Sequence, residues 1–339
     1  MIKSTVLVTG GAGFIGSHLT DELIKLGYEV FILDDLSGGF LENIDPRASF
    51  IRGSITDQSL IEKIFVEKRI DYVFHLAAYA AEGLSHFIKR FNYSNNLIGS
   101  INLINASVNH EVKCFIFTSS IAVYGKNQLP MTEAMVPTPE DPYGIAKLAV
   151  EQELRVSSEM FGMNYVIFRP HNVYGERQNI GDRYRNVVGI FMNQIMQGQQ
   201  MSIFGDGEQT RAFTYIHDVV PVIAAAPSNP RALNQVFNIG ADQPYTINNL
   251  SKKVADAMGV PANVKYLAPR NEVKHAFSSH RRLQKVFGYT PKYSLETGLA
   301  RMVSWARSVG SRRGQFFTDI EIAKNLPETW QETLSLTKP

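Results

Sequence analysis

Two kinds of segment alternate at short spacing through the first half of the chain, and this alternation constrains the fold more than any other feature. Short runs rich in apolar and β-branched residues lie at residues 5–8, 29–33, 72–76, 113–118 and 164–168. Segments with apolar residues at helical spacing separate them, at residues 17–26, 59–68, 92–108 and 143–161. Continuous apolar strands separated by amphipathic helices specify a parallel sheet with helices on both faces, because right-handed crossovers place them there. The sequence therefore predicts an α/β fold with a doubly wound parallel sheet of the Rossmann type.

The composition of the chain and the length of its periodic segments change after about residue 170. Gly, Asn, Gln and Arg become more frequent, and the periodic segments become shorter. The apolar run at residues 236–239 is typical of a strand that returns to the sheet. We therefore predict a Rossmann domain at residues 1–170 with a return segment at 213–240. A second, smaller, partly interleaved α/β lobe is predicted at residues 171–212 and 241–325, closing over the strand ends.

Charge and cysteine content limit the possible partners and the compartment. The 339 residues include 34 Lys and Arg against 32 Asp and Glu, a net charge of +2, so we expect neither a nucleic-acid nor a membrane partner. The single cysteine, Cys114, lies in an apolar run and is predicted to be a core residue of a reducing compartment. The N-terminal apolar run is too short for a signal peptide, so we expect a cytoplasmic protein. We predict no metal site.

A glycine-rich loop follows the first predicted strand and opens the first predicted helix. Its sequence is Thr9-Gly-Gly-Ala-Gly-Phe-Ile-Gly16. Gly11 and Gly13 allow the backbone to approach a pyrophosphate, and Gly16 allows the helix to pack closely on the strand. The helix N-terminus supplies N–H groups for the phosphate charge. The context of strand, loop and helix therefore predicts a dinucleotide-binding site.

An acidic residue at the end of the second strand selects the dinucleotide. Asp34 lies 34 − 16 = 18 residues after Gly16, near the ~20 expected for the carboxylate that binds the adenosine ribose. A carboxylate there repels a 2′-phosphate, and Asp35, Ser37 and Gly38 follow it without a nearby arginine. NAD is therefore predicted rather than NADP.

A tyrosine and a lysine four residues apart are the strongest candidates for the chemistry. Asp141-Pro142 is typical of a helix start and places Tyr143 and Lys147 on one face. A phenol with a pKa near ~10 is a weak base at neutral pH. A neighbouring ammonium stabilises the phenolate and brings it into a working range. Ser120 follows another predicted strand at the carboxyl edge, where its hydroxyl can relay a proton to the tyrosine.

Together these motifs resemble the extended short-chain dehydrogenase/reductase family, and within it the nucleotide-sugar epimerases typified by UDP-glucose 4-epimerase. The resemblance covers residues 7–291 and rests on TGGAGFIGSH, SSIAVYG, PYGIAK and GDGEQTRAFTYIHDV. It implies that Ser120 is a hydrogen-bond partner of the reacting oxygen and that Tyr143 is the catalytic acid and base. It implies that Lys147 tunes Tyr143 and binds the nicotinamide ribose.

The resemblance and the motifs also give candidate binding residues. For tightly bound NAD they are Gly10, Gly13, Phe14, Ile15, Gly16, Asp34, Asp35, Ser37, Gly38, Ser54, Ile55, Leu76, Ala77, Ala78, Ala80, Asn95, Ser120, Tyr143, Lys147 and His171. For the nucleotide-sugar substrate they are Ser120, Tyr143, Asn172, Val188, Arg211, Arg270 and Ala276. In the family, Arg211 falls on the arginine that pairs with the substrate diphosphate.

The residues after Ser120 separate the reactions of the family. Dehydratases carry an Asp-Glu pair where this chain has Ile121-Ala122, and elimination needs a placed acid and base. We therefore predict C4 epimerisation of a UDP-hexose through a transient 4-keto sugar, with NAD regenerated in each cycle. A UDP-glucuronate 4-epimerase, or a dehydratase or reductase of the same family, is the alternative. A catalytically silent NAD-binding scaffold is a further reading, which the complete Ser, Tyr and Lys set disfavours.

Sugar specificity and assembly remain open at this point. By resemblance Ala276 matches a gate residue, where a small side chain admits a 2-acetamido group, so 2-acetamido sugars are possible substrates. Arg183, Arg185, Lys274 and His86 can instead face a C6 carboxylate, and no spacing decides between them. The loop at residues 79–87 is unlike the common family loop. A homodimer is predicted through the helices at 92–108 and 143–161.

Overall fold

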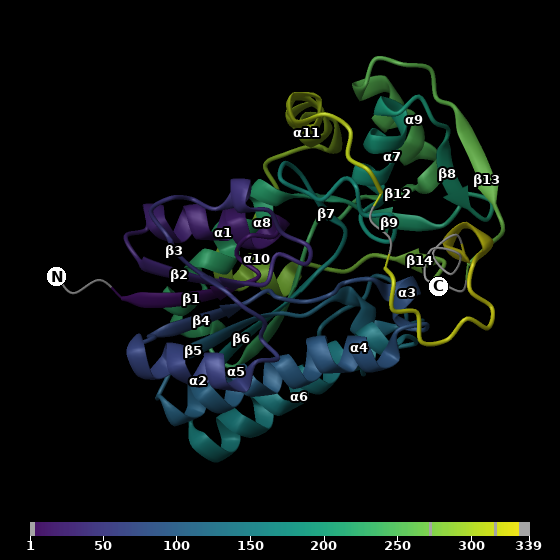
Figure 1. Ribbon diagram of the computed structural model, residues 1–339. Helices are drawn as coiled ribbons and strands as arrows, with labels where there is room; N and C mark the ends of the chain where they lie inside the picture. Colours follow the sequence, from purple (N-terminus) through teal and green to yellow (C-terminus); the bar gives the residue numbers. More distant parts are fainter. Residues whose placement is uncertain (1–3, 271–272, 315–316, 332–339) are drawn as a thin grey trace, which may run out of the picture.

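A seven-stranded parallel sheet forms the centre of the molecule (Figure 1). The computed structural model describes residues 4–270, 273–314 and 317–331. The strand order is β11-β6-β5-β4-β1-β2-β3, and every neighbouring pair is parallel. The strands are β1 (Thr5–Thr9), β2 (Glu29–Asp34), β3 (Ser49–Arg52), β4 (Tyr72–His75), β5 (Cys114–Thr118), β6 (Asn164–Pro170) and β11 (Gln235–Ile239). The predicted doubly wound α/β fold is confirmed.

Helices cover both faces of this sheet. One face packs on α1 (Phe14–Lys25), α8 (Ile216–Ala225) and α10 (Arg281–Phe287), and the other on α2 (Gln58–Glu67), α5 (Gly99–Asn109) and α6 (Pro142–Phe161). Within β1, Val6 and Val8 face the first layer, and Leu7 faces the second. This two-sided burial is the reason that the strands are continuously apolar rather than alternating. Cys114 is buried, and burial raises the pKa of its thiol to about 12.

The smaller lobe lies beyond the carboxyl ends of the strands. It contains α7 (Val187–Met196), α9 (Ile247–Ala257) and α11 (Leu295–Val309), with the paired strands β8 (Met201–Phe204) and β13 (Val264–Leu267). A three-stranded sheet of β12 (Pro244–Thr246), β9 (Thr210–Ala212) and β14 (His275–Ala276) joins it, as does the pair β7 (Val173–Tyr174) and β10 (Thr214–Tyr215). The lobe lies next to the edge formed by the carboxyl ends of the strands, which is where ligands of such folds bind.

Short elements complete the chain. The 3₁₀ turns are η1 (Leu41–Asn43), η3 (Ile121–Tyr124), η4 (Ala226–Ser228) and η5 (Pro230–Ala232), and α3 (Glu82–Ser85) is a single helical turn. None of the helices in the described ranges has the length and apolarity to cross a membrane.

The structure departs from the sequence-based expectations at particular elements. Strand β3 was not predicted, because it is a half-exposed edge strand with little apolar periodicity. The expected helix at residues 92–108 begins earlier, at α4 (Lys89–Tyr93), and continues through the π-helical turn η2 (Ser94–Ile98) into α5. Helix α10 packs on β11 of the large sheet, so the segment at residues 241–325 does not belong to the smaller lobe throughout.

Candidate active site

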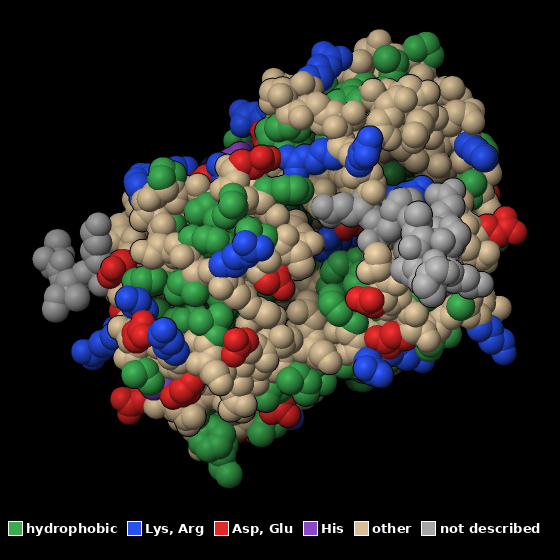
Figure 2. Space-filling model, in the orientation of Figure 1, with side chains coloured by type: hydrophobic (Ala, Val, Ile, Leu, Met, Phe, Trp, Pro, Cys, Tyr) green, Lys and Arg blue, Asp and Glu red, His purple; other side chains and the backbone are tan. Residues whose placement is uncertain are grey.

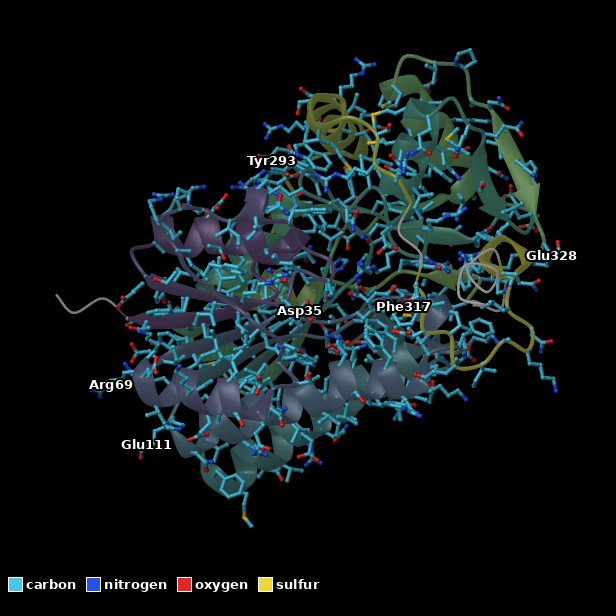
Figure 3. All side chains as sticks on the ribbon, viewed as in Figure 1. Asp35, Arg69, Glu111, Tyr293, Phe317 and Glu328 are labelled. Atoms are coloured by element: carbon cyan, nitrogen blue, oxygen red, sulfur yellow. The ribbon has the colours of Figure 1, made fainter. Side chains whose placement is uncertain are left out.

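A cleft of about 750 Å³ lies between the carboxyl edge of the large sheet and the smaller lobe. Figure 2 shows the surface hollowed between the two parts, with Lys and Arg side chains at its border. In Figure 3, Asp35 and Phe317 are labelled in the middle of the molecule, Asp35 from the segment after β2 and Phe317 from the C-terminal segment. The volume is in the range of small-molecule and cofactor sites.

The glycine loop forms one wall of this cleft. Gly10 has a φ of +72°, and a Cβ there would lie 2.8 Å from the Ala77 nitrogen. A Cβ on Gly16 would lie 2.1 Å from the Gly10 carbonyl oxygen, so only glycine permits this close packing. The N-cap of α1 is Gly13, which has no side chain to cap the first N–H groups. The residues therefore fit a dinucleotide pyrophosphate at the helix N-terminus.

Asp34 lies at the end of β2, next to this loop. Its carboxylate accepts hydrogen bonds from the Ala12 nitrogen at 3.0 Å and the Leu36 nitrogen at 2.8 Å. Burial raises the pKa of Asp34, and the backbone donors oppose the shift. The carboxylate thus ties two loop segments together at the position expected for the adenosine ribose.

Tyr143, Ser120 and Lys147 meet at the opposite end of the same cleft. Helix α6 is capped by Asp141, which accepts from the Gly144 nitrogen at 2.8 Å, and the helix presents Tyr143 and Lys147 one turn apart. The Lys147 ammonium donates to the Thr118 carbonyl oxygen at 2.9 Å and lies 5.8 Å from the centre of the Tyr143 ring. The Ser120 side chain hydrogen-bonds to the Tyr143 hydroxyl.

Burial disfavours the charged form of both titratable groups in the ligand-free site. Burial raises the pKa of Tyr143, while the Ser120 hydrogen bond and the charge of Arg185 oppose the rise. Burial lowers the pKa of Lys147 to about 7, and the charge of Glu151 opposes the fall. A phenolate and an ammonium formed side by side would relieve both costs, because each stabilises the other.

A buried ion pair holds α6 against the strand ends behind these residues. The Arg169 guanidinium donates to Glu151 through Nε at 2.9 Å and through a second nitrogen at 2.5 Å. The Ser119 hydroxyl donates to the same carboxylate at 2.5 Å. This group fixes the register of α6 on β6 and thereby the position of Lys147.

Most of the candidate residues line the cleft. They are Gly10, Gly13, Phe14, Ile15, Gly16, Asp34, Asp35, Ser37, Gly38, Ile55, Leu76, Ala77, Ala78, Ala80, Asn95, Ser120, Tyr143, Lys147, Asn172, Val188, Arg211 and Arg270. The Arg211 guanidinium is held by the Val273 carbonyl oxygen at 2.6 Å, and the Arg270 guanidinium lies 3.8 Å from the centre of the Phe204 ring.

Three candidates lie outside the cleft lining. Ser54 hydrogen-bonds to Thr56 at 2.8 Å, and its neighbours line the cleft instead. His171 is buried with its ring 5.2 Å from that of His280 and shares a hydrogen bond with it at 3.0 Å. Ala276 packs in an apolar cluster under η3. Side-chain direction at each of these positions depends on tertiary contacts that the sequence does not display.

The structure separates the four cations that the sequence left open for a C6 carboxylate, and it adds one cleft residue that no motif marked. Arg185 is paired with Asp182 through Nε at 2.6 Å and lies 4.8 Å from the centre of the Tyr79 ring. It lines the cleft, and its charge opposes the rise that burial causes in the pKa of Tyr143. Arg183 and His86 also line the cleft, whereas Lys274 lies outside it and faces Asp206 at 4.0 Å. Trp330 lines the cleft from the far end of the chain, and no sequence motif marked it.

Comparisons with known proteins agree with this geometry. Residues 6–240 match the model of the NAD dependent epimerase/dehydratase family. The chain is 36% identical over 309 residues to a protein of Methanocaldococcus jannaschii named putative UDP-glucose 4-epimerase, across 89% of this chain and 98% of that protein.

Two solved structures have the same fold and a similar sequence. UDP-glucose 4-epimerase of Thermotoga maritima with UDP-glucose has a TM-score of 0.86 and 39% identity, covering 90% of this chain and 99% of that chain. UDP-N-acetylglucosamine 4-epimerase of Methanobrevibacter ruminantium M1 has a TM-score of 0.85 and 35% identity, covering 91% of this chain and 100% of that chain.

The family match spans well over half of the chain, and the relatives are matched along almost their whole length. The glycine loop and Asp34 fit NAD, which is the cofactor of the family. The chain therefore belongs to the NAD-dependent epimerase/dehydratase family and is an NAD-dependent epimerase.

Proposed function

We propose that the protein interconverts the C4 epimers of a UDP-hexose, with UDP-glucose and UDP-galactose as the first candidates. The observation that carries the proposal is the meeting of Ser120, Tyr143 and Lys147 in one cleft with the NAD-fitting loop. The positions after Ser120 hold Ile121 and Ala122 in η3, which supply no acid or base for elimination. Oxidation and reduction at one carbon then remain as the chemistry that the site supports.

The protein groups have defined parts in this reaction. Tyr143 takes the proton of the C4 hydroxyl, with the Ser120 hydroxyl hydrogen-bonded to the same oxygen. The Lys147 ammonium stabilises the phenolate form of Tyr143. NAD, if bound, would supply a reversible hydride acceptor at C4; with return of the hydride to the opposite face of the 4-keto sugar, no external reductant would be consumed. Arg211 and Arg270 are proposed to hold the substrate diphosphate, which supplies binding energy remote from the reacting carbon.

The charge at the sugar end favours a neutral sugar over a uronate. Arg185, Arg183 and His86 are the cleft residues that a C6 carboxylate could use as a partner. The charge of Arg185 is already balanced by Asp182 at 2.6 Å, and a substrate carboxylate would have to compete with that partner. UDP-glucuronate is therefore the second candidate, and the 2-acetamido sugars are a third within the same reaction.

A panel of nucleotide sugars tests the proposal. The purified protein is incubated separately with UDP-glucose, UDP-N-acetylglucosamine and UDP-glucuronate, and C4 inversion is read by NMR. We expect conversion of UDP-glucose without net accumulation of NADH. Conversion of UDP-glucuronate alone would replace the first candidate by the second. No inversion of any of the three would reject the proposal.

Assembly and compartment are part of the same proposal. We propose a homodimer in which the outer faces of α5 and α6 of two copies pack together, since exposed apolar side chains lie along α6 and on η2, the turn that leads into α5. We propose a cytoplasmic location, which the single buried thiol of Cys114 supports.

A further inference from the structure

A segment beyond α11 crosses from the smaller lobe to the large domain. Residues 317–331, here called the C-terminal strap, pack against the loop that follows β4 (Figure 1). In Figure 3, Phe317 lies inside near α3, whereas Glu328 lies at the outer edge. The apolar contacts join Leu326 and Trp330 to Ala81, Leu84 and Ile88. The unusual loop at residues 79–87 is therefore the docking surface of the strap.

Polar contacts fix the strap at its middle. The Glu321 carboxylate accepts from the Arg90 nitrogen at 2.8 Å and from the Phe91 nitrogen at 2.8 Å. These are N–H groups of the first turn of α4, whose own N-cap residue Ile88 supplies no side-chain cap. An anion is favoured there because the helix N-terminus is positive. The Glu321 nitrogen also donates to the Phe87 carbonyl oxygen at 2.9 Å.

Aromatic contacts connect the strap to both halves of the molecule. The ring centre of Phe317 lies 4.8 Å from that of Phe91 in the large domain. The ring centre of Trp330 lies 6.2 Å from that of Phe87 and 5.1 Å from that of Tyr184, which comes from the smaller lobe. Aromatic pairs in this range are attractive beyond their burial. The strap thus bridges the two walls of the cleft.

Trp330 itself forms part of the cleft wall. It is only 4% exposed, so the indole is fixed by its surroundings. A Cβ on Gly83 would lie 3.4 Å from the indole, and the Arg270 guanidinium lies 5.7 Å from the ring. Glu82, His86 and Tyr184 line the same part of the cleft. Arg270 and Tyr143 line the same cleft, and the charge of Glu82 raises the pKa of Tyr143.

We propose that the strap is a specificity element of this enzyme, in which the Trp330 indole contacts the hexose of the bound nucleotide sugar and limits its bulk. The inference rests on the proposed function for the class of ligand. A rigid aromatic ring suits a sugar because the hexose carries apolar C–H groups on the faces of its own ring. An ordered wall also needs no rearrangement on binding.

Tryptophan fluorescence tests the contact without reference to turnover. The chain has two tryptophans, and Trp305 lies on α11 outside the cleft lining. The Trp305→Phe holoenzyme therefore reports on Trp330 alone. We expect a saturable change in its emission with UDP-glucose and a smaller change with UDP, which lacks the sugar. Equal changes with both ligands, or no change with either, would overturn the contact.

Kinetics of strap variants test the effect on specificity. We expect Trp330→Ala to raise KM for UDP-glucose about tenfold, with kcat within about twofold, because uniform binding is lost. The increase in KM should be smaller for UDP-N-acetylglucosamine, because removal of the indole makes room for its larger sugar. Glu321→Gln should move KM in the same direction by loosening the strap. Ile322→Ala, on the exposed side of the strap, is the matched control and should behave as the parent.

The two proposals fail in different ways. Trp330→Phe keeps an aromatic wall and should lie between the parent and the alanine variant, which separates a contact from misfolding. If the parent inverts a sugar but its KM values are unchanged in Trp330→Ala, the strap inference is wrong and the proposed function stands. If no sugar is inverted but the Trp330 emission responds to UDP-glucose, the proposed reaction is wrong and the strap contact stands.

Discussion

Tyr143 and Lys147 show how burial and chemistry compete at single residues. The surroundings that exclude water from the cleft raise the pKa of Tyr143 and lower that of Lys147. Burial thus disfavours the charged form of each group by itself, and the ionisation of one group makes that of the other more favourable. In a site of this kind, the tyrosine can act as a base only after the substrate and the cofactor have bound and added their charges.

Replacing the phenol tests this assignment directly. Tyr143→Phe should lower the rate of C4 inversion by about 10²–10⁴-fold, the usual contribution of a placed acid and base. NAD binding should persist, since the glycine loop and Asp34 are untouched. The rate is measured by NMR on saturating substrate, and the NAD content by release on denaturation. A phenylalanine variant with the parent rate would remove Tyr143 from the reaction.

Lys147 should give a pH-dependent term in stability. Its folded pKa is about 7, below the unfolded value of ~10.4. Below pH 7 the Lys147 amine is protonated in both the folded and the unfolded chain, so burial of the charged ammonium lowers the free energy of unfolding by its full amount. Above it the unfolded chain binds more protons, so the free energy of unfolding rises with pH, by at most about 1.4 kcal/mol per pH unit.

The comparison with Lys147→Met isolates this term. Urea unfolding of the ligand-free proteins is measured between about pH 6 and about pH 9, where other groups contribute equally to both. The free energy of unfolding of the parent should increase relative to that of the methionine variant as the pH rises. Parallel curves for the two proteins would show that Lys147 keeps an ordinary pKa.

Among the helices, α6 carries Tyr143 and Lys147, the proposed catalytic pair, and its placement depends on buried polar contacts. The helix begins at its Asp141 cap and is fixed to β6 by Glu151 and Arg169, whose side chains are each only 5% exposed. Removing one partner of a buried pair leaves an uncompensated charge. The pair is therefore a positional device more than a source of net stability.

Glu151→Gln should lower the free energy of unfolding by about 3–5 kcal/mol. The amide offers one acceptor where the Arg169 guanidinium and the Ser119 hydroxyl require more. Glu159→Gln is the matched control, because Glu159 pairs with Arg155 on the exposed side of the same helix. Its cost should stay below about 0.5 kcal/mol. Equal urea midpoints for the two variants would contradict the role given to the buried pair.

At the scale of the whole molecule, the outer face of α6 is more apolar than a solvated face needs to be. Ile145, Val156 and Met160 are exposed along it, and Ile98 is exposed on η2, which contacts α6. Such a stripe is typical of a protein interface. The proposed homodimer would cover it.

A charge on this stripe should separate the subunits. Val156→Asp is expected to sediment as a monomer where the parent sediments as a dimer, because the carboxylate would be buried without a partner. Val66→Asp on α2 is the matched control, since Val66 is exposed and lies on another helix. A monomeric parent would contradict the dimer, and a dimeric Val156→Asp would contradict this interface.

Most strands of the large sheet, the glycine loop and the proposed catalytic residues can be predicted from the sequence alone. Each depends on local patterns: apolar runs of strands, glycines that a close backbone approach demands, and Tyr143 and Lys147 spaced by one helical turn. Local geometry fixes such features, so spacing along the chain is enough to predict them.

Only the tertiary structure decided which side chains face the cleft from distant segments. His171 lies between the cleft residues Pro170 and Asn172 but packs away from the cleft, as does Ala276, whereas Trp330 reaches the cleft from the C-terminal strap. Of the four cations that the sequence left open for a C6 carboxylate, Arg185, Arg183 and His86 line the cleft and Lys274 does not. Their directions are set by contacts between segments far apart in the chain, such as Trp330 with Phe87. No periodicity or spacing records those contacts, because they exist only once the two halves of the molecule have packed together.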